Sequence, residues 1–537
     1  MSQSVISRDQ LLIVGAGPTG LTLAIELWSR GVQCRVIDKR PGPALTSRSF
    51  TIQPRTAEGF ARSRCIDPFL AIGKQHRGMA FHFRGEDTVE YLDFGVLETP
   101  FPHILIVEQN DTEAVLREQL ASLGGTIEWD TELESISTDA DGRITAVLHH
   151  NNNRGSGRER IHPDWLVGCD GLNSTVRTQI GFDFEGTCYA GMRFRMMDVE
   201  VVNPYPGSEA WIDYWIDPDY MLLTTALPSA YRVLISDMND APRAQAQPDP
   251  GAAREAFQPV VSSWLPDAVL GVPKWCTEFD IWRRTASGYR RGRILLAGDA
   301  AHIHSPAAGM GMNTCIQDAF NLGWKLAAVA TGRAPEALLD TYEEERLPIA
   351  AQVGEASHML HLIMMAHGDS IEARLEIIRQ PEFHYQAAAR IAGLTYHYRD
   401  IIAQPPGLIC LGGLTAGDRA PDVPITSAMS VHDLLGHFGY TLLVLQRRPG
   451  STVAADVAEA AAPYRDLLRT AVITSPDIRA TAPAGALIAD DNDVHDRYGQ
   501  PGDDTLCLIR PDGHLALRLP AADMDMLLTT LNATVLA

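Results

Sequence analysis

The stretch of this 537-residue chain that most limits its possible folds lies close to the N-terminus. Four apolar residues, Leu11 to Val14, have the length and composition of a buried strand, and they lead directly into Gly15-Ala16-Gly17-Pro18-Thr19-Gly20. A helix-like stretch follows and ends at Arg30-Gly31. In such a strand–turn–helix unit, Gly15 permits the tight turn, Gly17 lets the backbone approach a pyrophosphate, and Gly20 lets the helix pack on the strand.

The residues after this unit support nucleotide binding. A second strand, Cys34 to Ile37, ends in Asp38, 18 residues beyond Gly20, where a carboxylate can accept hydrogen bonds from a ribose diol. The helix N-terminus offers N–H groups and a partial positive charge to phosphates. A glycine turn with only a structural role is the alternative, and these residues alone do not distinguish FAD from NAD.

A second motif lies in the middle of the chain, from Leu166 to Arg177. An apolar strand leads into an Asp170-Gly171 turn, and Ser174 follows where it can cap a helix that has Arg177 in its opening turns. Taken alone, this motif could equally be a capped strand-to-helix turn in which the aspartate supports only the turn itself.

A third motif runs from Arg293 to Asn313. A strand ends at Asp299, whose carboxylate can hydrogen-bond a ribityl hydroxyl, and the loop then reaches Gly309 and Gly311, which let backbone amides approach a planar ring. A helix from near Asn313 to about residue 330 directs its positive end at that ring, which suits negative charge on a reduced flavin.

The three motifs together resemble those of the group A flavoprotein monooxygenases, the p-hydroxybenzoate hydroxylase-like aromatic hydroxylases, over residues 10 to about 400. By this resemblance, Arg48 in Thr46-Ser47-Arg48-Ser49 and Gln109 in Val107-Glu108-Gln109-Asn110 match residues that the family places beside FAD. A solvated arginine and an ordinary polar residue at a helix start are the alternatives. The family's DG motif is implicated in both FAD and NAD(P)H binding, which implies the same for Asp170 and Gly171.

The sequence and the resemblance together define a set of expected cofactor-binding residues. These are Gly15, Gly17, Pro18, Thr19, Gly20, Asp38, Lys39, Arg48, Gln109, Asp170, Gly171, Asp299, Pro306, Gly309, Gly311, Met312 and Asn313.

The predicted fold is α/β, with an FAD-binding Rossmann-like domain, an inserted antiparallel-sheet substrate domain and a C-terminal thioredoxin-like domain. Residues 1–185 and 286–400 are assigned to the first, with 76–108 contributing to the substrate domain of 186–285, and residues 410–537 to the third. Pro-Pro-Gly at 405–407 begins the predicted linker. The runs 416–422 and 510–514 resemble the thioredoxin-like tail of phenol and polyketide hydroxylases. Because the chain has no CxxC pair, we expect packing or dimer contacts from this tail rather than dithiol chemistry.

Composition excludes several classes of function. A formal charge of −22 without a compensating basic run argues against nucleic acid, and an anionic substrate would need a local basic pocket. The first ten residues lack a signal-peptide pattern, and glycines, a proline and Glu26 interrupt the most membrane-like stretch, so we expect a cytoplasmic protein without a membrane span. The eight cysteines occur singly, and His302 and His304 lack a third ligand at a recognisable spacing, so no metal is expected.

The resemblance implies an FAD-dependent monooxygenase that takes electrons from NADPH or NADH and hydroxylates a phenolic, possibly polyketide, substrate through a flavin C4a-hydroperoxide. The flavin carries this chemistry, so no catalytic side chain is assigned and the phenol-activating base is left open. An apolar pocket must exclude water. Its candidate residues are Trp211, Tyr214, Trp215, Tyr220 and Met221.

Several alternatives remain open from the sequence. The same scaffold could perform Baeyer–Villiger oxidation or epoxidation, or bind FAD as a regulator without turnover. The lack of a second GxGxxG and of a cysteine pair disfavours a disulfide reductase, and the late Gly298-Asp299 motif disfavours a simple dehydrogenase. A monomer or homodimer is expected.

Overall fold

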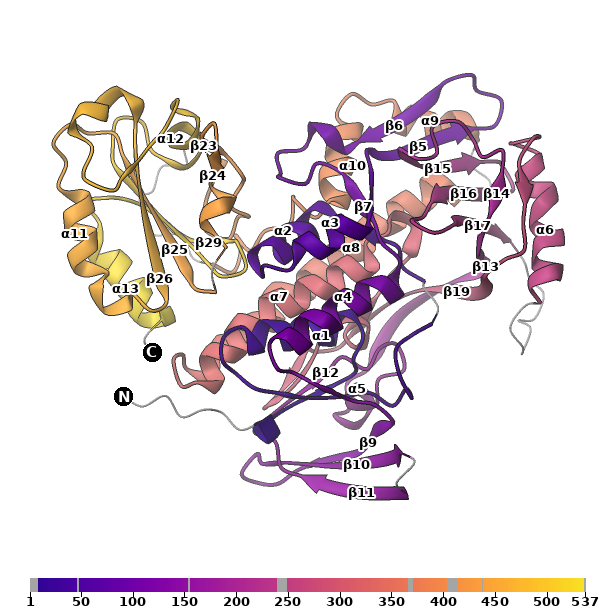
Figure 1. Cartoon of the computed structure of the whole chain (residues 1–537), viewed down its shortest axis with the longest axis horizontal. Helices are drawn as coiled ribbons and strands as arrows, with labels where there is room; N and C mark the ends of the chain where they lie inside the picture. Colours follow the sequence, from indigo (N-terminus) through magenta and orange to yellow (C-terminus); the bar gives the residue numbers. More distant parts are fainter. Residues whose placement is uncertain are drawn as a thin grey trace.

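The computed structural model describes residues 8–45, 48–152, 155–238, 249–365, 370–402, 413–436 and 438–535. Pro-Pro-Gly at 405–407, where the linker predicted to run to Pro424 begins, lies outside these residues. The predicted α/β class is confirmed, and the elements are arranged as two large sheets, a third sheet near the C-terminus and the helices that pack on them (Figure 1).

The N-terminal motif belongs to a six-stranded sheet in which every neighbouring pair is parallel except β20 and β21. The central strands are apolar throughout because helices cover them, which is typical of a parallel sheet. In order across the sheet, the strands are β20 (Arg290–Arg291), β21 (Ile294–Leu296), β12 (Trp165–Gly168), β1 (Leu11–Val14), β2 (Arg35–Ile37) and β8 (Ile127–Glu128).

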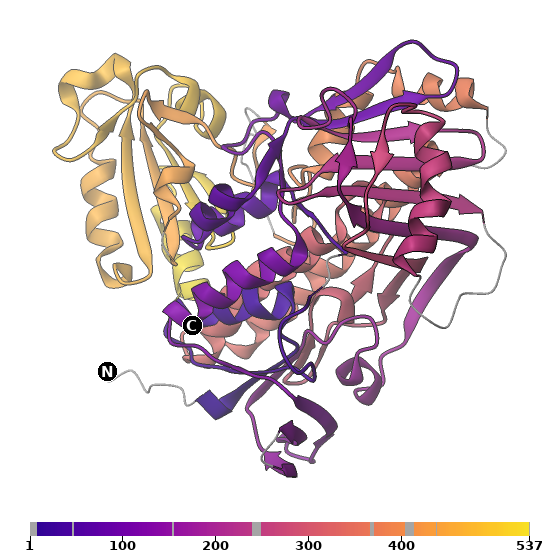
Figure 2. The same cartoon turned by 45° about the vertical axis from the view of Figure 1, so that its right-hand side comes forward.

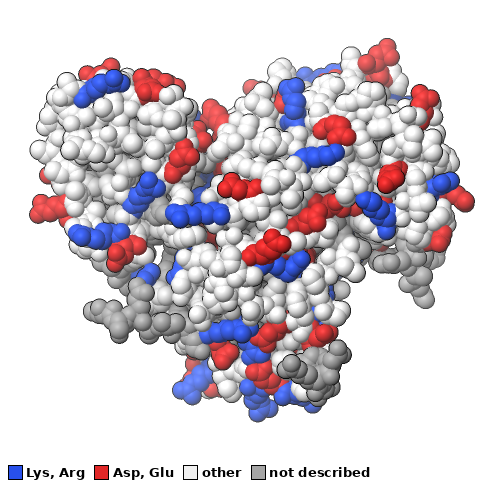
Figure 3. All heavy atoms as spheres, viewed as in Figure 1, with Lys and Arg blue, Asp and Glu red and all other residues white. Residues whose placement is uncertain are grey.

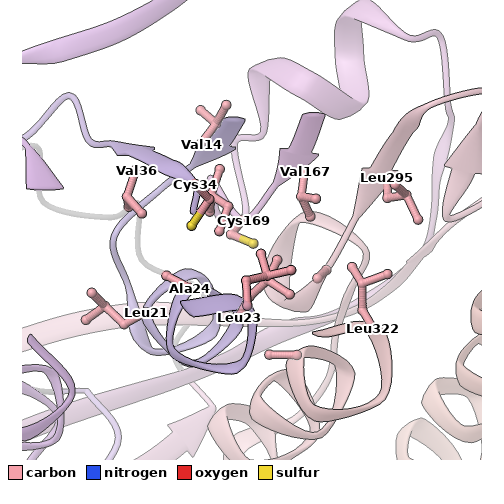
Figure 4. Close-up of a cluster of buried hydrophobic side chains, with 14 of the residues drawn as sticks. Val14, Leu21, Leu23, Ala24, Cys34, Val36, Val167, Cys169, Leu295 and Leu322 are labelled. Carbon is pink, nitrogen blue, oxygen red and sulfur yellow. The ribbon is translucent and has the colours of Figure 1, made fainter. Parts of the chain in front are cut away.

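Three helices pack side by side near this sheet, α1 (Pro18–Trp28), α4 (Gln109–Ser122) and α7 (Gly311–Ala330) (Figure 1). The long helix expected from near residue 313 to about 330 is therefore confirmed as α7. Figure 4 shows the core where α1 and α7 meet strands β1, β2, β12 and β21. The labelled side chains there are Val14, Leu21, Leu23, Ala24, Cys34, Val36, Val167, Cys169, Leu295 and Leu322.

The second large sheet has eight strands, and all neighbours are antiparallel except β15 and β5, which run parallel. Strands β5 and β6 come from the region 76–108 and lie beside strands from 186–285. In order, the strands are β22 (His302–Ile303), β19 (Trp275–Ala286), β13 (Phe184–Val199), β17 (Tyr231–Met238), β16 (Tyr220–Ala226), β15 (Trp211–Ile216), β5 (Gly78–Phe83) and β6 (Val89–Asp93).

Smaller sheets and further helices complete this part of the chain. The small sheets are β9 (Thr131–Thr138) with β10 (Ile144–Asn152) and β11 (Gly155–Ile161); β3 (Thr51–Ile52) with β7 (Ile104–Ile106) and β4 (Lys74–His76); and β14 (Val201–Val202) with β18 (Val269–Leu270). The helices are α2 (Pro54–Arg62), α3 (Ile66–Ile72), α5 (Thr175–Gln179), α6 (Pro250–Ser262), α8 (Asp340–Met365), α9 (Ile371–Ile378) and α10 (Phe383–Ile391).

The C-terminal segment forms its own sheet, seen in orange and yellow in Figures 1 and 2. Three parallel strands continue into an antiparallel hairpin, the arrangement expected for a thioredoxin-like fold. Its strands, in order, are β27 (Leu487–Ile488), β26 (Leu468–Thr474), β25 (Tyr440–Gln446), β28 (Thr505–Ile509) and β29 (Leu515–Pro520). The hairpin β23 (Pro424–Thr426) and β24 (Met429–Ser430) and helices α11 (Val453–Ala460), α12 (Asp493–Tyr498) and α13 (Met524–Val535) accompany them.

The surface carries charges of both signs. Figure 3 shows lysines and arginines interspersed with aspartates and glutamates over the face seen in Figure 1. Among the described residues, no helix is both long enough and apolar enough to span a bilayer.

Candidate active site

One cavity of about 730 Å³ brings the three sequence motifs together. Fifteen of the 17 predicted cofactor residues line it, and Gly20 and Asn313 do not. The residues are Gly15, Gly17, Pro18, Thr19, Asp38, Lys39, Arg48, Gln109, Asp170, Gly171, Asp299, Pro306, Gly309, Gly311 and Met312.

The glycine-rich turn forms one wall of the cavity. Gly15 has φ +108°, and a Cβ there would lie 2.3 Å from the Cys169 carbonyl oxygen, so only glycine fits. Gly17 is the N-cap of α1 and makes no side-chain cap, while a Cβ at Gly17 would meet no protein atom within 4 Å. Helix α1 therefore begins beside the open space of the cavity, as a phosphate site requires. Gly20 packs instead, since its Cβ would lie 2.0 Å from the Gly15 oxygen.

Asp38 stabilises this turn from the end of β2. Its carboxylate accepts a hydrogen bond from the Ala16 N–H at 2.8 Å and pairs with the Arg40 guanidinium at 3.0 Å. Lys39 and Arg40 also line the cavity. The sequence reasoning missed Arg40, although its position two residues after the strand-end aspartate was a usable signal.

The Asp170-Gly171 turn lines the cavity as well as supporting itself. The Asp170 carboxylate accepts hydrogen bonds from the N–H of Thr175 at 2.7 Å and from the Ser174 hydroxyl at 2.5 Å. Ser174 in turn caps α5, accepting from the Arg177 N–H at 2.9 Å, as predicted. The self-supporting alternative thus describes the hydrogen bonds of Asp170 correctly, but it does not account for the turn's place on the cavity wall.

The third motif supplies the opposite wall. Asp299 faces the cavity, and desolvation by the protein atoms around it raises the pKa of its carboxyl group. The Cys315 thiol donates to this carboxylate at 3.2 Å, a contact that the sequence reasoning missed. Gly309 has φ +63°, and a Cβ there would lie 2.6 Å from the Thr51 hydroxyl oxygen. Helix α7 begins at Gly311 without a side-chain cap, so its positive end faces the cavity.

Asn313 holds this loop rather than lining the cavity. Its side chain donates to the backbone oxygens of Thr51 and Gly309, both at 2.9 Å, and accepts from the Gln53 N–H at 2.8 Å. The asparagine therefore fixes the loop against strand β3 and the start of α2.

Arg48 and Gln109 both line the cavity. The Arg48 guanidinium lies 5.9 Å from the centre of the Phe279 ring. Gln109 is the first residue of α4, and its amide donates to Glu113 at 3.2 Å, so it is both a helix-start residue and a wall residue. Thr46 and Ser47, which precede Arg48 in the motif, lie outside the described residues.

The five residues predicted to line the substrate pocket do not line this cavity, and their place in a substrate pocket stays a prediction. Trp215 points to the other face of the sheet, where it stacks on His82 at 3.8 Å, and Trp211 packs on Tyr91. Tyr214 lies behind the loop of the third motif, residues 298–310, which is called the flavin loop or GD loop below. Its hydroxyl donates to the backbone oxygen of Ala307 in this loop at 3.0 Å.

Tyr220 and Met221 sit elsewhere in the same sheet. Tyr220 bonds Arg84 at 3.1 Å, and Met221 is buried in the core on the side of Tyr214. Strand β19 provides the wall in their place, through Phe279, Ile281 and Trp282. The sequence reasoning did not single out β19, whose place beside the loop is set by strand pairing.

The imidazole rings of His302 and His304 are nearly parallel, and both residues line the cavity. His302 bonds the buried Asp318 carboxylate at 2.7 Å. Burial lowers the pKa of His304 to about 4, so this imidazole is neutral at physiological pH. Among the described residues there is no cluster of three or more side chains suited to a metal.

These features fit an elongated dinucleotide with a planar ring. The volume is within the range of cofactor pockets, two uncapped helix N-termini face it, and the Gly17 position leaves room that a Cβ would fill. FAD meets this description.

Comparisons with known proteins agree with the geometry. Residues 8–357 match the family described as FAD binding domain, and residues 414–536 match the aromatic-ring hydroxylase C-terminal family. Pentachlorophenol 4-monooxygenase of Sphingobium chlorophenolicum is 39% identical over 97% of this chain and 96% of that protein. The chain belongs to the group A flavoprotein monooxygenases.

Other members of this group are similar over almost the whole length. The 12-dehydrotetracycline 5-monooxygenase/anhydrotetracycline 6-monooxygenase of Streptomyces rimosus is 31% identical over 95% of both chains. The structure of the OxyS anhydrotetracycline hydroxylase from Streptomyces rimosus has a TM-score of 0.76 and 28% identity, covering 98% of this chain and 99% of that one. The predictions of FAD as cofactor and of an aromatic monooxygenase are confirmed, and NAD(P)H is the electron donor typical of the group.

Proposed function

We propose that this monooxygenase hydroxylates a phenol of one or a few rings, using NADPH or NADH. The observation that carries the proposal is the cavity of about 730 Å³ in which three segments meet apolar side chains of β19. These segments are the glycine turn at 15–20, the Asp170-Gly171 turn and the GD loop that begins at Gly298-Asp299. Pentachlorophenol 4-monooxygenase, similar over almost the whole chain, acts on a phenol and favours this substrate class.

We assign the cofactor roles to residues on the walls of the cavity. The α1 N-terminus at Gly17 would bind the pyrophosphate, Asp299 would accept a hydrogen bond from a ribityl hydroxyl, and the α7 N-terminus at Gly311 would face the flavin ring. When bound, FAD supplies hydride acceptance from NAD(P)H and the activation of dioxygen.

The protein's own part on the substrate side is orientation, charge and exclusion of water. Phe279, Ile281 and Trp282 contribute apolar surface that would help to keep water from the reacting centre, and the Asp280 carboxylate of the same strand lines the cavity beside them. Arg48 is a cation on this wall, and its side chain makes no hydrogen bond within the described part of the chain, so it could balance the charge of a phenolate. Neutral His304 adds no competing positive charge there.

Turnover with a panel of phenols tests this proposal. FAD-loaded protein is given NADPH or NADH with chlorinated single-ring phenols, unsubstituted phenols and fused-ring phenols, and NAD(P)H consumption, product and hydrogen peroxide are all quantified. We expect a phenol to speed NAD(P)H consumption and to gain one oxygen atom from isotopically labelled dioxygen. Oxygen inserted next to a ketone, or across a double bond, would assign Baeyer–Villiger oxidation or epoxidation instead. FAD binding with no phenol-dependent consumption would favour a regulator.

A matched pair of tryptophan variants separates the cavity wall from the sheet as a whole. Trp282→Leu should increase peroxide relative to product because it opens the apolar wall, whereas Trp211→Leu, away from the cavity in the same sheet, should leave that ratio unchanged. Equal ratios in the two variants would remove β19 from the proposed substrate site.

Three broader assignments belong to the same proposal. We propose the division at 1–185 with 286–400, 186–285 and 410–537, a monomeric or homodimeric state, and a cytoplasmic location. Limited proteolysis, light scattering and cell fractionation test them in turn.

A further inference from the structure

The C-terminal sheet and its helices, residues 413–436 and 438–535, are called the C-terminal unit here. A buried ion cluster joins this unit to helix α8. Arg510, which follows β28, contacts both carboxylate oxygens of Glu345 at 2.8 Å. Lys325 and Asn321 of α7 contact one of the same oxygens, at 2.8 and 2.6 Å. The Arg510 and Glu345 side chains are only 6% and 2% exposed, so these charges must remain paired.

The next residue of α8 continues the connection toward the cavity. The Arg346 guanidinium pairs with the Asp318 carboxylate at 2.7 Å. The other oxygen of Asp318 accepts from the Gly298 N–H at 3.0 Å and from His302 at 2.7 Å. Gly298 immediately precedes Asp299 on the cavity wall. Three contacts, Arg510–Glu345, Arg346–Asp318 and Asp318–Gly298, together with the α8 backbone between Glu345 and Arg346, therefore lead from the C-terminal unit to the GD loop.

A second, independent feature lies along the same route. A cavity of about 40 Å³ is lined by His514 of the C-terminal unit, by Arg346 and by Gln53 and Met310 behind the flavin loop. The buried side-chain oxygens of Gln53 and Tyr396 on its wall make no hydrogen bond to the described residues. A space of this size with two unsatisfied polar groups on its wall is suited to an ordered water, which would link the C-terminal unit to the loop.

We propose that Arg510 is a positioning residue for FAD binding: through Glu345, Arg346 and Asp318 it holds the GD loop in the geometry that binds the cofactor. The C-terminal unit lines no part of the large cavity within the described residues. Its influence on the cofactor would therefore pass through α8. This inference rests on the proposed place of FAD in the cavity.

A second buried ion pair, where the C-terminal unit contacts helix α2, offers a matched control. Arg419 of the C-terminal unit pairs with Glu58 of α2, and its Nε lies 3.0 Å from a carboxylate oxygen of Glu58. The two side chains are 8% and 0% exposed. This pair also docks the C-terminal unit, but it makes no contact with α8 or Asp318. A loss of docking alone should therefore affect Arg419→Met and Arg510→Met equally.

The test measures the FAD dissociation constant by titration of full-length apoprotein, with thermal unfolding of the same apoprotein as the control for stability. We expect Arg510→Met to weaken FAD binding roughly tenfold, Arg419→Met to leave it within about twofold, and Arg510→Lys to recover part of the loss. Arg510→Met should add nothing further in an Asp318→Asn background, because the connection is already broken there.

Other outcomes would overturn the inference. Equal weakening by Arg510→Met and Arg419→Met would reduce Arg510 to a docking contact, and FAD affinity unaffected by Arg510→Met would remove its role. If Arg510→Met does not fold, Glu345→Gln against Glu58→Gln gives the same comparison with smaller changes. Gly17→Ala is measured alongside: if it too leaves FAD affinity unchanged, the proposed FAD placement fails rather than the coupling alone.

Discussion

Gly17 offers the sharpest test of where the cofactor binds, because adding one carbon there should affect the ligand and spare the protein. Its φ of −79° and ψ of −177° are open to alanine, and the added Cβ meets no protein atom within 4 Å. We therefore expect the free energy of unfolding of Gly17→Ala apoprotein to stay equal to the wild type or to rise by about 0.4–1 kcal/mol.

The affinity for FAD, by contrast, should fall in Gly17→Ala. The new methyl group would stand between the α1 N-terminus and a pyrophosphate, and losing one hydrogen bond to a charged group costs roughly 1.5–3 kcal/mol. The dissociation constant should then rise by roughly ten- to a hundredfold. Flavin fluorescence titration of apoprotein measures this constant, and urea unfolding measures stability.

Gly20→Ala is the companion variant. Its Cβ would lie 2.0 Å from the Gly15 oxygen, so the backbone must shift and the apoprotein should lose about 3 kcal/mol of stability. The reasoning is refuted if Gly17→Ala binds FAD as tightly as the wild type, or if it destabilises the apoprotein as much as Gly20→Ala does.

The remaining predictions concern single side chains. Asp299→Asn should weaken FAD binding roughly tenfold through loss of a charge-assisted hydrogen bond, measured by the same titration. Arg232→Met should destabilise the protein by about 3 kcal/mol in urea, because it leaves the buried Asp198 carboxylate without its guanidinium partner. Burial opposes ionisation of Glu345, but Arg510 and Lys325 outweigh it and lower its pKa from 4.5 to about 2. The stabilisation from this ionised group is thus complete above pH 4.5 and lost as the pH falls toward about 2, and the stability difference between wild type and Glu345→Gln should shrink over that window.

The cofactor side of the site could be predicted from the sequence because its signals are local. Gly15 and Gly309 stand in short motifs whose backbone geometry requires glycine. Asp170 stands in a turn that its carboxylate holds by hydrogen bonds, and all three residues line the cavity. The helix after the third motif could be predicted from near Asn313 to about residue 330 for the same reason, since a glycine-rich loop precedes it and Gly332 follows it.

The substrate side could not be predicted in this way, because the face of a strand is set by its neighbours. Successive residues of a strand point to opposite faces, so Tyr214 and Trp215 had to lie on different sides of the sheet. Which side faces the loop depends on the pairing of β19 with β22 and with β13, and β13 is far from β19 in sequence. None of the aromatic residues named from the sequence therefore belongs to the wall to which Phe279 and Ile281 of β19 contribute.

The same limit explains why the charge network could not be anticipated. Glu345 and Arg346 are consecutive on α8, yet one pairs with the C-terminal unit and the other with Asp318 below the flavin loop. No spacing rule links positions 318, 345 and 510. Since burial makes each unpaired charge costly, these long-range pairs must form together, and the C-terminal unit, the loop and α8 are then fixed relative to one another. A tail that lines no part of the cofactor cavity can in this way still decide whether the cavity has the shape to bind its ligand.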